Sequence, residues 1–289
     1  MLTKEQFLAK LNNGALILDG ATGSNLRAAG MPKNCCTEIW VLEHPEPLVA
    51  LQRAYAQAGS HIIYAPTFQA TPPALEKEGL AAHTEKINEA LVSLSRAAAP
   101  GCPIAGDLTT MAAVCESWDP DNFDLMVAAY RRQIRGLMDG GADLLIGETL
   151  LYPQEAEAIW EAAQLENAGA VLFTFTMQPD GTLFSGQDAA RVLHELEVLG
   201  AAAVGFNCVA ASGDTPFLVS KLRRQVKGPL ICKPNAGLPA SAPDGTECYP
   251  MTAEEFASIQ AQCLRFGATL LGGCCGTTPD HIAALRNIG

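Results

Sequence analysis

Eight short aliphatic runs recur along the chain, and this recurrence constrains the fold more than any other feature of the sequence. Each run follows a turn that contains Gly or Pro, and each is apolar almost throughout instead of alternating with polar residues. Such runs are typical of parallel strands buried on both faces. The predicted strands are residues 15–19, 61–67, 104–108, 143–147, 171–176, 203–207, 230–233 and 269–272.

Helical stretches separate these runs, with apolar residues at a spacing of three and four. They cover residues 47–57, 84–97, 125–138, 155–164, 188–199, 217–225, 253–266 and 279–286. Glycines that end helices recur before the next strand. Eight strand–helix alternations predict a single (β/α)8 TIM barrel over residues 1–289. A doubly wound open sheet is the rival, but it usually has fewer strands, and no GxGxxG follows the first run.

The composition excludes several classes of function. The formal net charge of −12 argues against broad contact with nucleic acid, which requires basic patches. No apolar run approaches the roughly 20 residues that a membrane-spanning helix needs. The chain opens without a secretory signal, so we expect a cytoplasmic, small-molecule enzyme; its oligomeric state is not predicted. Its ten cysteines fit poorly with a disulfide scaffold, because such scaffolds are short and secreted.

Three cysteines lie where a barrel places its chemistry. Cys208 ends the sixth predicted strand, and Cys274 and Cys275 end the eighth. The carboxyl ends of barrel strands meet at one face, where active sites are built. Because the sixth and eighth strands are near neighbours around the ring, we expect the three sulfurs to converge. The longest irregular segment, residues 237–252, follows the seventh strand and lies at the same face.

Adjacent cysteines on a regular strand would point to opposite faces. Gly272, Gly273 and Gly276 surround this pair and are expected to let the backbone turn, so that both sulfurs face one ion.

Three thiolates suit Zn²⁺. A structural zinc takes a fourth protein ligand, whereas a catalytic zinc keeps that position for water or substrate. The sequence therefore predicts a catalytic zinc whose natural substrate is another thiol, held as thiolate at neutral pH. The alternative is that these cysteines are small buried hydrophobes, which is the usual role of a cysteine at a strand end.

The other cysteines are expected to be packing or surface residues: Cys102, Cys115, Cys232, Cys248 and Cys263. Cys35 and Cys36 form a second adjacent pair. They could bind a metal or form a redox pair, but no third ligand is evident nearby. The five histidines are scattered and offer no competing site.

Six sequence blocks resemble those of the zinc-dependent homocysteine S-methyltransferases, including the homocysteine-binding barrel of cobalamin-dependent methionine synthase. The most specific are GFNC and GGCCGTTPDHI. The blocks are residues 19–26, 65–71, 147–149, 205–208, 234–237 and 272–282, so the resemblance covers nearly the whole chain.

The resemblance implies a role for each matching residue. Cys208, Cys274 and Cys275 match the zinc ligands. Asp19 and Glu148 match the carboxylates that hold the ammonium of homocysteine, and Asn235 matches a residue that approaches zinc when homocysteine is absent. The turn of Gly20, Ala21, Thr22 and Gly23 matches the segment that receives the carboxylate of homocysteine. The family forms methionine by attack of the zinc-bound thiolate on an activated methyl group.

The methyl donor is less constrained. Thr149 stands where betaine-using members usually have Tyr, which argues against betaine as the methyl donor. The blocks at residues 65–71 and 272–282 most resemble those of the methionine synthase barrel, and the sequence holds no cobalamin module. Methylcobalamin on a separate corrinoid protein is therefore the expected donor. S-methylmethionine, S-adenosylmethionine and betaine are the alternative donors.

Two further hypotheses change the substrate or the class of protein. In one, the zinc site methylates a different small thiol. In the other, the chain is a zinc- or thiol-sensing binding protein without catalysis.

Overall fold

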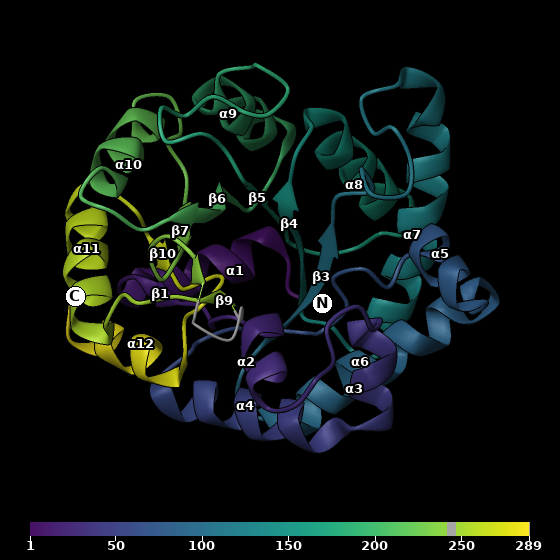
Figure 1. The fold of residues 1–289 in the computed structure, drawn as a ribbon. Helices are drawn as coiled ribbons and strands as arrows, with labels where there is room; N and C mark the ends of the chain where they lie inside the picture. Colours follow the sequence, from purple (N-terminus) through teal and green to yellow (C-terminus); the bar gives the residue numbers. More distant parts are fainter. Residues whose placement is uncertain (242–246, 289) are drawn as a thin grey trace.

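A computed structural model describes residues 1–241 and 247–288, and it confirms the predicted barrel (Figure 1). Eight parallel strands in the described residues form one sheet, in the order β1-β10-β7-β6-β5-β4-β3-β2. A parallel bridge between Leu18 and Ile62 joins the two ends of this sheet. The strands are β1 Leu16–Ile17, β2 Ile63–Tyr64, β3 Ile104–Thr109, β4 Leu144–Leu150, β5 Val171–Phe175, β6 Ala203–Ala210, β7 Leu230–Asn235 and β10 Leu270–Leu271.

Each barrel strand is followed by a helix of the outer ring (Figure 1). These helices are α4 Pro45–Ala58, α6 Thr84–Ala98, α7 Phe123–Asp139, α8 Pro153–Leu165, α9 Ala189–Leu199, α10 Thr215–Arg223, α11 Ala253–Arg265 and α12 Pro279–Ala284. Local signals set their ends. In α11, for example, Thr252 and Glu255 form a reciprocal capping box, and α4 ends at Gly59 in the left-handed region. No helix of the described residues is long and apolar enough to cross a bilayer.

Several short elements were not expected from the sequence. Within the described residues they are α1 Lys4–Lys10, α2 Gly23–Ala28, α3 Thr37–Glu43, α5 Pro72–Leu75, five 3-10 turns and the antiparallel pair β8 Ala240–Ser241 with β9 Glu247–Cys248. The turns are η1 Leu11–Asn13, η2 Glu76–Glu78, η3 Ala81–His83, η4 Pro120–Asn122 and η5 Leu285–Asn287. The pair β8–β9 lies within the segment predicted to be irregular.

The barrel interior changes from apolar to polar along the strands. Phe7 of α1 is fully buried and belongs to a cluster with Leu144, Leu172 and Ile231, near the strand beginnings, so α1 closes the amino end. Residues two apart on a strand share a face. Two positions after Leu172 and Ile231 lie the buried polar residues Thr174 and Lys233. Glu148 lies four positions after Leu144, and Asp107 is buried on β3. The carboxyl end of the barrel is therefore lined by polar and charged groups.

Candidate active site at the carboxyl end of the barrel

The three predicted cysteines converge. The Sγ atom of Cys275 lies 4.0 Å from that of Cys208 and 4.0 Å from that of Cys274. All three sulfurs lie within 4.8 Å of one another, and all three residues are half-buried. They meet because β6, which carries Cys208, and β10, which precedes the other two, both pair with β7.

Backbone irregularities bring the sulfurs together. Cys208 has φ 56°, where the pairing of β6 with β7 shifts register between Asn207 and Ala210. Such a bulge re-aims a side chain at the end of a strand. Backbone bonds to β7 then hold the pair: the Cys274 N–H donates to Pro234 O at 2.8 Å, and Cys275 O accepts from the N–H of Ala236 at 2.9 Å.

The three glycines around the cysteine pair are required for two different reasons. Gly276 adopts φ 79°, as a turn there would require. Gly272 and Gly273 do not adopt left-handed backbone angles, so the prediction that their conformational freedom lets the backbone turn is wrong. They are needed for space: a Cβ on Gly273 would lie 2.4 Å from Thr277, and one on Gly272 would lie 2.8 Å from Leu18 Cβ.

Mutual hydrogen bonding among the thiols favours a negative charge on one sulfur. S–H donation from Cys208 and from Cys274 lowers the pKa of Cys275 to about 3. Hydrogen bonds to Cys274 and to Cys275 raise the pKa of Cys208 far above its ordinary value. The cluster therefore favours a thiolate over three neutral thiols, and a cation would favour further deprotonation.

The cluster fits a tetrahedral zinc ion. With Zn–S bonds of about 2.3 Å, tetrahedral sulfurs would lie about 3.8 Å apart, close to the 4.0 Å between the sulfur of Cys275 and each of the other two. Soft thiolate ligands bind zinc in preference to hard cations, which prefer oxygen ligands. At the end of β7, the buried side-chain oxygen Oδ1 of Asn235 has no hydrogen-bond partner in the described part of the chain. It is a candidate fourth group.

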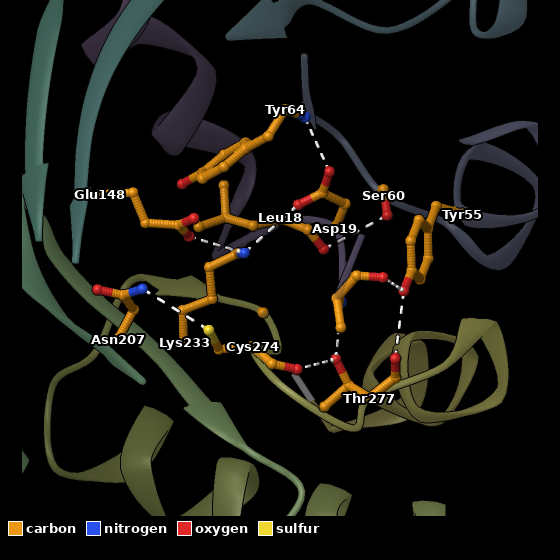
Figure 2. A network of polar contacts seen from close by, with 12 residues as sticks. Leu18, Asp19, Tyr55, Ser60, Tyr64, Glu148, Asn207, Lys233, Cys274 and Thr277 are labelled. Carbon is orange, nitrogen blue, oxygen red and sulfur yellow. Dashed lines mark hydrogen bonds and ion pairs between the residues drawn. The ribbon is translucent and has the colours of Figure 1, made fainter. Parts of the chain in front are cut away.

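Asn207 connects the cysteines to β4. Its Nδ2 donates to Thr149 Oγ1 at 2.6 Å and lies 3.7 Å from the Sγ of Cys274 (Figure 2), while its Oδ1 accepts from the N–H of Thr149. Thr149 has φ 58°, at a second register shift, between β4 and β5. Sequence reasoning missed this link, although Asn207 precedes Cys208 in the GFNC block.

Asp19 and Glu148 share the barrel mouth with the cysteines, but an ammonium group of the protein lies between them. Lys233 Nζ is 2.9 Å from Glu148 Oε1 and 3.7 Å from Asp19 Oδ1 (Figure 2). It also lies 4.6 Å from the ring centroid of Tyr64. Lys233 was missed in the sequence, although a lysine two positions after buried Ile231 is an inward charge and could have been noticed.

Burial controls the charge states of this cluster. It raises the pKa of Asp19 to about 7, against the attraction of Lys233 and a hydrogen bond from the N–H of Tyr64. Burial also raises the pKa values of Glu148 and Asp107. Burial lowers the pKa of Lys233, but the attraction of Glu148 and Asp19 outweighs it, so the pKa lies well above its usual value. Lys233 is therefore a permanent cation at neutral pH.

The predicted turn Gly20, Ala21, Thr22 and Gly23 lies against the cysteine loop. A Cβ on Gly20 would lie 2.6 Å from Tyr55 Oη, so this position requires glycine for space. The Ala21 N–H donates to Thr277 Oγ1 at 3.0 Å, which in turn donates to Cys274 O. The N–H of Ala21 is thus already engaged.

The N–H groups of Gly20, Thr22 and Gly23 have no acceptor within the described residues, and α2 begins at Gly23. These three N–H groups are the ones left to receive an anion.

The second cysteine pair makes no comparable site. Cys36 Sγ contacts Glu38 Oε2 at 3.4 Å, and burial raises the Cys36 pKa to about 11. Within the described residues, the only cluster suited to a metal is the one at Cys208, Cys274 and Cys275. Of the remaining cysteines, Cys232 and Cys263 are buried, Cys102 and Cys115 half-buried and Cys248 exposed.

Comparison with known proteins places these features in a family context. Methionine synthases of Mycobacterium tuberculosis and Mycobacterium leprae are each 28% identical to the chain, over 96% and 95% of its length. The chain spans about a quarter of their length, 25% and 24% respectively.

The homocysteine methyltransferase MmuM from Escherichia coli has a similar structure over almost its whole length. Its oxidized form matches with a TM-score of 0.82 at 27% identity, covering 98% of this chain and 99% of MmuM. Its metallated form matches with a TM-score of 0.82 at 28% identity, covering 98% and 100%. The model of the family described as homocysteine S-methyltransferase matches residues 16–288. With its barrel fold, its converging cysteines and this match over nearly its full length, the chain belongs to the homocysteine S-methyltransferase family.

Proposed function

We propose that residues 1–289 act as one homocysteine-binding domain, a zinc-dependent S-methyltransferase that converts homocysteine to methionine. The convergence of three sulfurs at the mouth of the barrel supports this most strongly. Cys208, Cys274 and Cys275 would hold the ion. Bound zinc would keep the acceptor sulfur as a thiolate at neutral pH, where a free thiol is mostly protonated.

The residues around the cysteines suit the other two groups of an amino-acid thiol. Glu148, which lies across Lys233 from Asp19, would provide negative charge for the ammonium. The N–H groups of Gly20, Thr22 and Gly23 suit the carboxylate. Holding both ends of homocysteine would direct its sulfur toward the cysteines. During transfer the thiol proton is lost, the bond from methyl to donor breaks, and the bond from methyl to sulfur forms.

Methylcobalamin on a separate corrinoid protein is the donor that we favour. Large apolar side chains are exposed on three loops that follow barrel strands: Trp118 after β3, Phe184 after β5 and Leu238 after β7. Exposed apolar groups on one rim suit contact with a macromolecule. A small methyl donor, which would need no partner protein, is the second candidate.

An assay with several donors tests the proposal. Zinc-loaded protein is incubated with homocysteine and, separately, a methylcobalamin-loaded corrinoid protein, free methylcobalamin, S-methylmethionine, S-adenosylmethionine and betaine. We expect methionine with at least one donor, and most with the corrinoid protein. Methionine from any donor rules out a purely sensing role. No methionine from any of them, with zinc bound and the barrel folded, contradicts the proposal.

A further inference from the structure

The ammonium of Lys233 occupies the place between the two carboxylates that an amino-acid acceptor would use. It lies 2.9 Å from Glu148 Oε1, 3.7 Å from Asp19 Oδ1 and 4.6 Å from the centre of the Tyr64 ring (Figure 2). A lysine ammonium has three donors. These three neighbours surround it, and only 4% of its side chain is exposed.

A second ammonium would have to share both carboxylates with Lys233. Asp19 Oδ2 accepts from the N–H of Tyr64 at 2.8 Å, and its buried Oδ1, which has no hydrogen-bond partner among the described residues, lies 3.7 Å from Lys233 Nζ. The Glu148 side chain is 10% exposed and already accepts from Lys233 through Oε1. Glu148 alone therefore reaches the open mouth, and it does so with part of its charge neutralised.

A fixed positive charge here changes which acceptors are favoured. It repels an incoming ammonium and attracts an anion, and burial strengthens both effects. The remaining contacts proposed for the acceptor, the cysteine site and the N–H groups of Gly20, Thr22 and Gly23, require only a thiol and a carboxylate. They do not distinguish an amino acid from the same molecule without its amino group.

We propose that Lys233 is a specificity-determining residue that extends the acceptors of this site to ω-mercaptocarboxylates, thiols that lack the α-ammonium of homocysteine. The inference rests on the proposed function, since it concerns the acceptor of that same site. Methyl transfer to such a thiol balances as for homocysteine: the thiol proton leaves, the donor loses its methyl group, and a thioether forms.

Calorimetric binding to the zinc-loaded, reduced protein tests the inference without a methyl donor. The two probes are L-homocysteine and 4-mercaptobutyrate, which differ only in the amino group. We expect the wild-type Kd values to differ by less than about tenfold. In Lys233→Met, binding of homocysteine should strengthen relative to 4-mercaptobutyrate by at least about threefold. Lys86→Met, on the exposed face of α6, should leave the ratio unchanged.

A wild-type preference for homocysteine of tenfold or more, or an unchanged ratio in Lys233→Met, overturns the inference. If Lys233→Met does not fold, Lys233→Gln replaces it, and the wild-type ratio needs no variant. Should the zinc-loaded wild type bind neither thiol, the proposed function fails as well. If it binds homocysteine alone, only the inference about Lys233 fails.

Discussion

At the scale of single residues, the three cysteines should be needed for zinc binding and activity but not for folding of the barrel. Cys274 lies at the strand end, outside the hydrophobic clusters that hold the barrel together. Cys274→Ala should therefore lose stoichiometric zinc and more than about 100-fold in activity while the barrel still folds. Cys248→Ala, at an exposed cysteine, is the matched control. Metal analysis and circular dichroism on both variants check this, and retained turnover in Cys274→Ala would refute its role as a ligand.

Asp19 gives the molecule a specific dependence of stability on pH. Burial raises its pKa from 3.8 to about 7, so the folded protein holds this proton more tightly than the unfolded chain. Its contribution is therefore full below about pH 4 and is lost as the pH rises to about 7. Relative to Asp19→Asn, the wild type should lose up to about 1.4 kcal/mol of unfolding free energy per pH unit in this window. Denaturant titrations from pH 4 to 8, at constant zinc, measure the difference; a gain with rising pH would contradict the assignment.

At the scale of elements, close helix packing outweighs helix propensity. Gly136 lies in α7 against α6, and a Cβ there would lie 2.3 Å from the backbone oxygen of Glu85. Alanine would otherwise favour the helix by about 1 kcal/mol. Because the obstacle is backbone, Gly136→Ala should be destabilising by about 1–3 kcal/mol. Gly101→Ala, which meets open space, should be close to neutral in the same thermal melts. Stabilisation by Gly136→Ala would show that the two helices separate easily.

The regular elements were predictable, and the irregular ones were not. The eight strands follow from continuous apolar runs and the outer helices from apolar periodicity, because a regular buried element leaves its pattern in many residues. Helices α2 and α5 span only six and four residues, too short to show a period. The left-handed backbone of Cys208 depends on the register shift beside β7, which is a tertiary contact. Lys233 lay within a predicted strand, but its partners come from β4 and the end of β1, far away in sequence.

At the scale of the whole molecule, the metal site is built on a core that does not depend on it. The buried clusters inside and outside the sheet contain none of the three cysteines at the mouth. Chelation should therefore lower the melting temperature but leave the secondary structure intact, unlike a zinc finger, which unfolds without metal. Circular dichroism during a melt, with and without chelator, checks this. Loss of helical signal at 25 °C would mean that the zinc holds the barrel together.

X-ray absorption at the zinc edge, on reduced protein with and without homocysteine, tests the central claim most directly. The site predicts one zinc per chain, held by Cys208, Cys274 and Cys275, with three sulfur neighbours at about 2.3 Å and one lighter atom. When homocysteine binds, the zinc should have four sulfur neighbours. Reduced protein that holds no stoichiometric zinc, or zinc with fewer than three sulfur neighbours, or a spectrum that homocysteine leaves unchanged, would contradict it.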